Sequence, residues 1–518
     1  MRIVSGTWYS TLALSAVALC GVPESAFGQA IEREYVTPIA GTSTQRFGYA
    51  LAVDGEFMVG GAPYEDSNYV NSGCAFVFRW DPVAADWIET QQLFPSDPEA
   101  DARFGVTVAI SGDAIAVGAA LEDNANGTNA GAVYVFRLDA FTGVWSEEQK
   151  IIENGGFSGN EFGTSVDLDG TALLIGASKC DMSAGLNAGC AFVYRWVNSW
   201  LNWVEEAMLV DPNSRAGDRA GYAVAIEGNL ALVASPLANQ AGVANAGSVA
   251  VWRESGSLWW HDQTLSASQK STGDQFGISL AVRNGLVIVG VPFEDGSATL
   301  VDSGAACLFR HDGTSYAEEV RFAHPTPGPG QQFGRDVDVD DNLVVVGSMT
   351  DDAFGSDAGC AFTFRRGRRR WAFDQPFAAS DAAADDHLGV QVALNDLQVL
   401  VAADGNNTVA GTDRGVVYGY LARELTAEIT PSAPAPDAPV TMTGLYGTPG
   451  TPVLLVLVDL DGTSMFVPLL TDVFGVDHLW TVTDTAPNPP LGMHVGLMLF
   501  KISATGPLVA SDTAYVDL

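Results

Sequence analysis

The chain has 518 residues, of which 47% are apolar and 10% aromatic, so it can bury a sizeable core and is not a disordered polymer. Lysine and arginine number 25 against 62 aspartates and glutamates, and the formal net charge of −37 makes nucleic acid and anionic membrane surfaces unfavourable partners. The 56 glycines and 24 prolines favour many short strands joined by turns over long helices.

The amino terminus has the pattern of a secretory signal peptide. Arg2 precedes an apolar stretch over residues 12–20, and the small residues Ala26 and Gly28 stand where a signal peptidase cleaves. This stretch is too short to span a bilayer, and no later segment has about 18 uninterrupted apolar residues. We therefore expect residues 1–28 to be removed, and the mature chain, without a transmembrane segment, to be secreted or held in the extracellular part of the cell envelope.

Beyond the signal peptide, one unit repeats seven times at intervals of 57, 58, 58, 56, 57 and 55 residues, which marks an array of supersecondary units. The units open with Phe-Gly or a close variant, at Phe47, Phe104, Phe162, Ala220, Phe276, Phe333 and Leu388. Fourteen residues after each opening comes a second landmark similar to Gly-Ala-Pro, at Gly61, Gly118, Gly176, Ala234, Gly290, Gly347 and Ala402. A glycine-led apolar and aromatic run follows 12 to 14 residues later as a third landmark.

The repeats have the strand pattern of propeller blades. Between the first two landmarks apolar residues alternate, as in Leu51 and Val53, and a tight turn such as Asp54-Gly55 then reverses the chain into a hairpin. The third landmark supplies a third strand and a mixed run a fourth, as in a propeller blade. The seventh unit lacks a fourth strand, whereas residues 33–39 look like one. We expect this early segment to complete the last blade and close the ring.

The Phe-Gly openings, Gly-Ala-Pro landmarks and glycine-led strands resemble FG-GAP repeats, the units of the integrin alpha-chain head propeller and of many exported bacterial proteins, over about residues 31–421. The resemblance implies an all-β fold with a seven-bladed β-propeller. Many such repeats carry a calcium loop between the first and second strands. Here those links are tight turns, and Asp336, Asp338 and Asp340 alternate with valines as in a strand. We therefore expect no metal and no cofactor.

One set of polar residues follows the second landmark by five positions in every unit. Because Asp and Asn side chains bond nearby backbone, normally two residues on, we interpret the set as a structural feature of the turns rather than as a ring of ligands. Its members are Asp66, Asp123, Asp181, Asn239, Asp295, Asp352 and Asn407.

A second polar set stands just before each opening landmark, on the face that carries the variable links and around the mouth of the central channel. Its members are Arg46, Arg103, Glu161, Arg219, Gln275, Gln332 and His387. These side chains either grip an anionic or polyhydroxyl ligand or cap solvated strand starts. The candidate ligand-binding residues are Arg46, Arg103, Arg219, Gln275, Gln332 and His387.

The remaining features are a cysteine pair and a carboxy-terminal appendage. Five cysteines remain after cleavage, and Cys180 and Cys190, which flank one loop, either form a disulfide or stay buried thiols. Residues 422–439 are rich in proline and predict a stiff linker. Residues 440–518 contain about six strand-like runs and predict a small Ig-like β-sandwich.

No catalytic residue is assigned, because the histidines are scattered and no nucleophile elbow, phosphate loop or zinc motif is present. We therefore predict an exported, noncatalytic binding or cell-adhesion protein that presents propeller loops to an unidentified protein or glycan. A structural envelope component without a discrete ligand is one alternative. The other is an enzyme acting on a polysaccharide, which would need perturbed carboxylates clustered in one pocket.

Overall fold

The computed structural model describes residues 32–39, 44–84, 86–256, 258–367, 370–395, 398–407 and 412–421, together with the backbone of seven strands between residues 426 and 517. The predicted signal peptide, residues 1–28, lies outside the described residues. Every regular element in the described part is a β-strand. Accordingly, this part contains no helix of the length and hydropathy that a membrane crossing requires.

The first three blades each consist of four strands that pair antiparallel in chain order. Blade 1 comprises β2 (Ala50–Asp54), β3 (Phe57–Ala62), β4 (Cys74–Asp81) and β5 (Asp86–Leu93). Blade 2 comprises β6 (Thr107–Ser111), β7 (Ala114–Ala119), β8 (Ala132–Asp139) and β9 (Val144–Ile152). Blade 3 comprises β10 (Phe162–Asp169), β11 (Ala172–Ala177), β12 (Cys190–Val197) and β13 (Asn202–Leu209).

The next three blades repeat this order, and the seventh contributes three strands of its own. Blade 4 comprises β14 (Val224–Glu227), β15 (Leu230–Ser235), β16 (Ser248–Ser255) and β17 (Leu258–Leu265). Blade 5 comprises β18 (Leu280–Arg283), β19 (Leu286–Val291), β20 (Ala305–His311) and β21 (Tyr316–Ala323). Blade 6 comprises β22 (Val337–Asp340), β23 (Leu343–Ser348), β24 (Cys360–Arg366) and β25 (Trp371–Phe377). Blade 7 begins with β26 (Leu388–Asn395), β27 (Gln398–Ala403) and β28 (Val416–Leu421).

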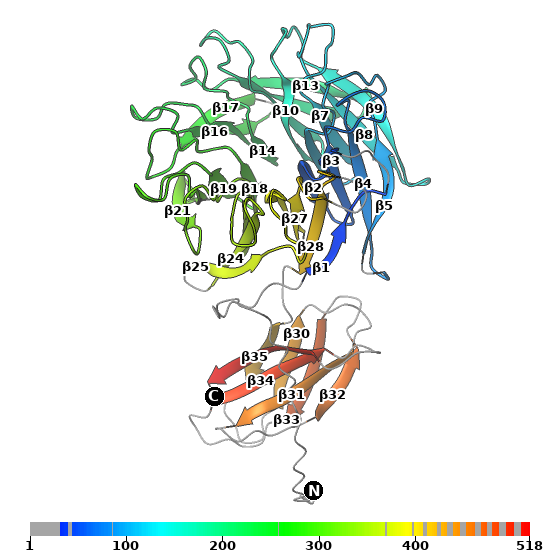
Figure 1. The fold of residues 1–518 in the computed structure, drawn as a ribbon, viewed down its shortest axis with the longest axis vertical. Helices are drawn as coiled ribbons and strands as arrows, with labels where there is room; N and C mark the ends of the chain where they lie inside the picture. The colour runs from blue at the N-terminus through cyan, green and yellow to red at the C-terminus, as the bar shows by residue number, and fades with distance from the viewer. Residues whose placement is uncertain are drawn as a thin grey trace, which may run out of the picture.

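The fourth strand of blade 7 comes from the other end of the propeller sequence. Strand β1 (Glu32–Val36) pairs antiparallel with β28, and Val36 faces Val417 in the register. Figure 1 shows β1, in blue, beside β28, in yellow. The predicted seven-bladed propeller, closed by its amino-terminal strand, is confirmed. With β1 in place, blade 7 has four strands, as the other blades do. Strand β1 also covers the edge of β28 that would otherwise be unpaired.

The hydrophobic core lies between blades rather than within them. Seven clusters of buried side chains each combine residues from two neighbouring blades, and together they fill all seven interfaces. The cluster between blades 7 and 1, for instance, packs Val36, Leu400 and Val417 against Phe47 and Phe76. Because both faces of every sheet are covered in this way, the ring itself supplies the core.

The repeat landmarks meet where neighbouring blades join. The amide of Phe104 donates to the carbonyl of Ser72 in the preceding blade at 3.0 Å, and the amide of Phe47 donates to Arg414 at 2.9 Å across the closing interface. Within a blade, the amide of Gly105 donates to the carbonyl of Gly118 at 2.9 Å, which links the first landmark to the second and accounts for their constant spacing.

The glycine that precedes the third strand is required for steric reasons. Gly415 has a φ of +78°, and a Cβ atom there would lie 1.9 Å from the carbonyl oxygen of Phe47. Any larger residue would push the closing blades apart. The glycine is therefore required both by its backbone conformation and by the close approach of the next blade.

Two further features are the cysteine pair and the carboxy-terminal strands. Cys180 and Cys190 are buried free thiols packed in one cluster. The later strands are β29 (Thr426–Pro431), β30 (Pro439–Leu445), β31 (Pro452–Leu460), β32 (Pro468–Val473), β33 (Leu479–Thr485), β34 (His494–Lys501) and β35 (Val509–Asp517). They form two sheets, ordered β29-β30-β33 and β32-β31-β34-β35. Strand β29 thus falls within the segment expected to be a linker, and the sandwich packing and domain boundaries stay predictions.

Replacing Gly415 by Ala should destabilise the closing joint. The matched control is Gly55→Ala, because Gly55 also has a positive φ, of +55°, but a Cβ atom there meets nothing within 4 Å. The control should cost about 1 kcal/mol of unfolding free energy from backbone strain alone, and Gly415→Ala at least about 2 kcal/mol more. Urea unfolding measures both values. Equal losses would show that the close approach of Phe47 does not matter.

Candidate functional site

The Asp and Asn residues that follow the second landmark all accept a backbone hydrogen bond in their own link. In blade 2, Asp123 Oδ1 accepts from the amide of Asn129 at 2.7 Å. The other bonds join Asp66 to Asn71, Asp181 to Asn187, Asn239 to Asn245, Asp295 to Asp302, Asp352 to Asp357 and Asn407 to Asp413. These bonds span five to seven residues rather than the expected two, because they close the whole link between the second and third strands.

The residues that precede the opening landmarks share an unusual backbone. All seven have a φ between 51° and 59°, in the left-handed region. The amide of each donates to a carbonyl of the preceding blade at 3.0 to 3.3 Å, as Arg103 does to Asn71. The backbone of this set is therefore part of the inter-blade joint, whatever its side chains do.

The side chains of three members of the set are connected through Asp404 and Tyr64. Arg46 Nη1 lies 3.8 Å from Asp404 Oδ2, and His387 Nδ1 lies 3.5 Å from the other oxygen of the same carboxylate. The Asp404 carboxylate raises the pKa of His387. The ring of Tyr64 lies between two guanidinium groups, 5.7 Å from that of Arg46 and 5.1 Å from that of Arg103. In contrast, Arg219, Gln275 and Gln332 enter no ion pair or ring contact with the described residues.

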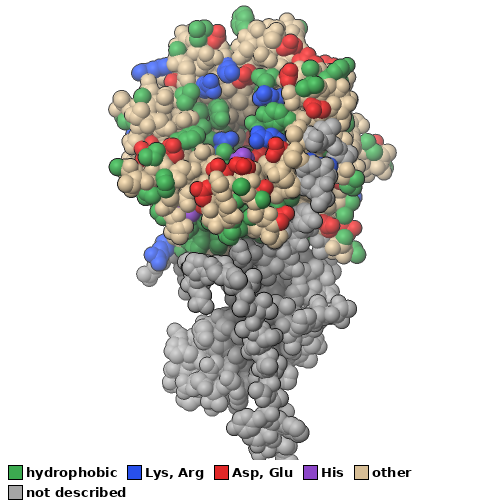
Figure 2. Space-filling view, viewed as in Figure 1, with side chains coloured by type: hydrophobic (Ala, Val, Ile, Leu, Met, Phe, Trp, Pro, Cys, Tyr) green, Lys and Arg blue, Asp and Glu red, His purple; other side chains and the backbone are tan. Residues whose placement is uncertain are grey.

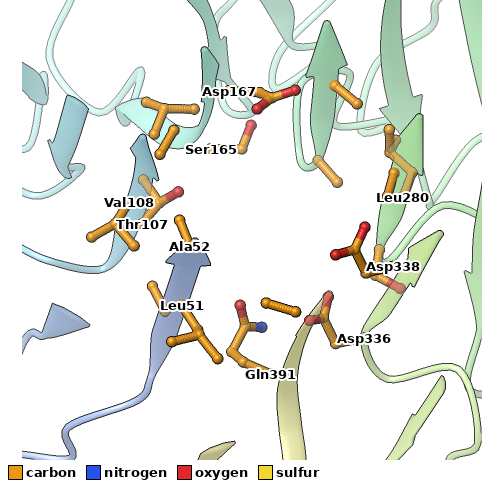
Figure 3. Close-up of a pocket in the computed structure, with 18 of the residues that line it drawn as sticks. Leu51, Ala52, Thr107, Val108, Ser165, Asp167, Leu280, Asp336, Asp338 and Gln391 are labelled. Atoms are coloured by element: carbon orange, nitrogen blue, oxygen red, sulfur yellow. The ribbon is translucent and has the colours of Figure 1, made fainter. Parts of the chain in front are cut away.

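Below the mouth, the inner strands enclose an axial channel of about 650 Å³. Its uppermost ring comes from residues two positions after each opening, not from the set that precedes it. These residues are Tyr49, Val106, Thr164, Tyr222, Ile278, Arg335 and Val390. Figure 3 shows the deeper part, where Thr107, Ser165 and Gln391 face the open space.

Six acidic residues line this channel, namely Asp54, Asp167, Asp169, Glu227, Asp336 and Asp338. Figure 3 labels three of them. Asp336 and Asp338 come from blade 6 and Asp167 from blade 3, on the other side of the opening in Figure 3. Each accepts a hydrogen bond from the inner strand of the next blade: Asp336 from Val392 at 2.8 Å, Asp338 from Leu394 at 2.7 Å and Asp167 from Ile226 at 2.7 Å. These bonds satisfy amides on the strand edge that lines the channel and hold the carboxylates in place.

The surroundings of these carboxylates raise their pKa values. Burial within the ring raises the pKa of Asp336 to about 7 and those of Asp167 and Asp338 to about 6, while bonds from backbone amides oppose the shift. The negative charge of Asp338 also raises the pKa of Asp336. Near neutral pH the channel therefore holds both protonated and ionised carboxyl groups.

A comparison of equivalent positions in the repeats distinguishes two of these residues. At the position five residues after the opening, blades 1, 2, 4, 5 and 7 all have alanine, whereas blades 3 and 6 have Asp167 and Asp338. Asp336 stands two residues earlier, where other blades have small or polar residues. Sequence reasoning considered Asp336 and Asp338 only as the remnant of a calcium loop. A comparison of the repeats position by position would have singled out the acids that replace alanine.

The comparisons with known proteins place the chain in a family. The FG-GAP repeat model matches residues 32–78, 87–136, 145–194, 203–252, 259–309 and 319–364, more than half of the sequence. The chain belongs to the FG-GAP repeat family. Each matched segment begins with a fourth strand and ends in a third strand, which agrees with the outer place of β1. Among curated protein sequences, none matches the chain.

Several solved structures have a similar fold. The periplasmic gluconolactonase PpgL of Pseudomonas aeruginosa is 14% identical, with a TM-score of 0.42 over 64% of this chain and 86% of that one. A putative 6-phosphogluconolactonase from Bacteroides uniformis is 11% identical, with a TM-score of 0.44 over 64% and 85%. Sqt1 of Saccharomyces cerevisiae is 9% identical, with a TM-score of 0.42 over 77% and 100%. At these identities the likeness concerns the fold alone.

The expected noncatalytic binding or adhesion role is corrected. Solved structures similar in fold include proteins named as lactonases. Because propellers as a class host unrelated activities, the fold itself gives no ground for excluding an enzyme. The missing motifs were also a poor guide, because a propeller site is assembled from different blades. The channel of this protein holds the group of perturbed carboxylates that the enzymatic alternative required.

Replacing Asp123 by Ala should lower the unfolding free energy by about 1 to 2 kcal/mol, because the amide of Asn129 loses its acceptor. Asp123→Asn keeps an acceptor oxygen and is the control, with a loss below about 0.5 kcal/mol. Chemical unfolding measures the stabilities. If Asp123→Ala left stability unchanged and abolished ligand binding instead, the structural interpretation of this set would be wrong.

The channel carboxylates should make stability depend on pH. Their pKa values in the folded protein, about 6 to 7, exceed the ordinary value of about 4, so the folded state binds more protons than the unfolded state between these limits. Stability should therefore fall as pH rises from about 4 to 7. Replacing Asp167, Asp336 and Asp338 together by Asn should reduce this loss of unfolding free energy by at least about 2 kcal/mol. The expected figure is modest because the channel is open to water, which weakens the shifts. Urea unfolding at several pH values tests it, and identical pH profiles would contradict it.

Proposed function

We propose that the chain is an enzyme that hydrolyses a C–O bond of a polyhydroxyl substrate inside its axial channel. The observation that carries this proposal is that three of the carboxyl groups lining one cavity, those of Asp167, Asp336 and Asp338, have pKa values of about 6, 7 and 6. Groups with pKa values near the working pH are effective general acids and bases, since they both give and take protons readily. The predicted signal peptide would export the enzyme from the cytoplasm.

The chemistry assigns a role to each side of the channel. Asp336, which has the highest pKa of the three, is protonated in part of the molecules at neutral pH and donates its proton to the leaving oxygen. Asp167, facing it from blade 3, takes a proton from the attacking water. The water oxygen forms the new bond to carbon, the old C–O bond breaks, and the two proton transfers balance. Asp338 lies beside Asp336 on the same strand face and supports its protonation by charge repulsion.

The lining favours a substrate with many hydroxyl groups. Thr107, Ser165, Ser279 and Gln391 supply hydroxyl and amide groups along the channel, and the carboxylates supply acceptors for substrate hydroxyls. A volume of about 650 Å³ is in the usual range for small-molecule sites and accommodates one or a few sugar rings. The reacting bond would lie at the depth of Asp336 and Asp338.

The test is a hydrolysis screen of the purified chain with aryl glycosides and sugar lactones. We expect Asp336→Asn to lower kcat/KM for the best substrate by at least about 100-fold, as is typical for loss of a general acid. Asp340→Asn is the matched control, because Asp340 lies on the same strand, β22, but does not line the cavity. Equal activities of the wild type and Asp336→Asn, or no hydrolysis across the panel, would contradict the proposal.

A further inference from the structure

Eight arginines among the described residues lie within 4.0 Å of a carboxylate oxygen, Arg46 included, whereas Arg103 and Arg335 do not. Arg137, Arg195 and Arg321, for example, each lie within 3.0 Å of a carboxylate oxygen. Among the described residues, Arg103 and Arg335 have no carboxylate within 4.0 Å. Figure 2 shows basic side chains gathered around a central hollow of the propeller.

Aromatic and arginine side chains from distant blades converge over the mouth. Arg335 of blade 6 lines the channel and lies near enough to Tyr49 of blade 1 to influence its pKa, as does Tyr222 of blade 4. Tyr49 in turn contacts Tyr64, with ring centroids 6.0 Å apart, and Tyr64 carries the guanidinium of Arg103 on its face. Tyr49 and Tyr64 therefore connect the channel lining to Arg103.

The two unpaired arginines also have unsatisfied hydrogen-bond donors. The Nε atoms of Arg103 and Arg335 are buried and have no acceptor. A buried donor without a partner costs free energy, so an acceptor supplied by a ligand would be favoured at this position. Guanidinium groups bind carboxylate and phosphate oxygens through paired N–H donors, which neutral hydroxyl groups cannot match in charge.

We propose that Arg335 and Arg103 bind an anionic group of the substrate, a carboxylate or a phosphate, at the mouth of the channel. This inference rests on the proposed function and narrows its substrate class to acidic sugars or sugar phosphates. Arg335 directly precedes Asp336, so an anion held by Arg335 places the uncharged part of the molecule next to the channel carboxyl groups.

Calorimetric titration of the full chain with D-glucuronate, D-glucose 6-phosphate and D-glucose tests the inference. We expect at least one of the two anions to bind at least 10-fold more tightly than glucose, and the tighter one identifies carboxylate or phosphate as the anionic group. Arg335→Gln should weaken that binding at least 10-fold, whereas Arg335→Lys should retain part of it because the charge remains. Arg79→Gln is the control, since Arg79 pairs with Glu56 away from the channel and should leave binding unchanged. Thermal unfolding checks that each variant is folded.

The possible results separate this inference from the proposed function. Equal affinities for glucose and both anions, no binding of either anion, or unchanged anion binding by a folded Arg335→Gln would overturn the anion site. Anion binding that is lost in Arg335→Gln, together with an absence of hydrolysis, would keep the anion site and overturn the hydrolytic role. Hydrolysis of neutral substrates that depends on Asp336 but not on Arg335 would keep the hydrolytic role and overturn the anion site.

Discussion

The ring depends on one repeated contact, between the Phe-Gly opening of each blade and the glycine-led third strand of the blade before it. The opening residue donates its amide to the preceding blade, its side chain is buried in the interface, and the glycine leaves room for the approaching carbonyl oxygen. The same contact joins Phe47 to Arg414 where the ring closes. Because the contact fixes how neighbouring blades sit, it also sets which side chains of the inner strands face the axis.

Most of the fold could be predicted because its determinants are local and repeated. The period near 57 residues, the glycines and the alternating strands each reflect a steric requirement of one blade, and the missing fourth strand of blade 7 pointed to β1. The candidate site could be predicted only in part. Arg46, Arg103 and His387 are connected through Tyr64 and Asp404, but the channel ring itself comes from residues such as Tyr49 and Arg335, two positions after the openings. Which side chains face the axis depends on the assembled ring, and no single repeat contains that information.

The channel carboxylates both stabilise the ring and have raised pKa values. Asp167, Asp336 and Asp338 bond amides on the inner edge of the next blade, which would otherwise face the channel without a protein acceptor. The ring that supplies these amides also removes much of the water around the carboxylates and raises their pKa values. Asp167 and Asp336 are far apart in sequence and belong to two different blades. A search for contiguous motifs therefore missed them, and this led to the noncatalytic prediction.

The central claim is that burial in the closed ring holds the channel carboxyl groups partly protonated near neutral pH. Carbon-13 NMR of aspartate-labelled protein follows each side-chain carboxyl through a pH titration, and single Asn variants assign the three signals. We expect apparent pKa values near 6 for Asp167 and Asp338 and near 7 for Asp336, with the neighbouring pair titrating together. Titration of all three signals near pH 4, as in carboxyl groups exposed to water, would contradict it.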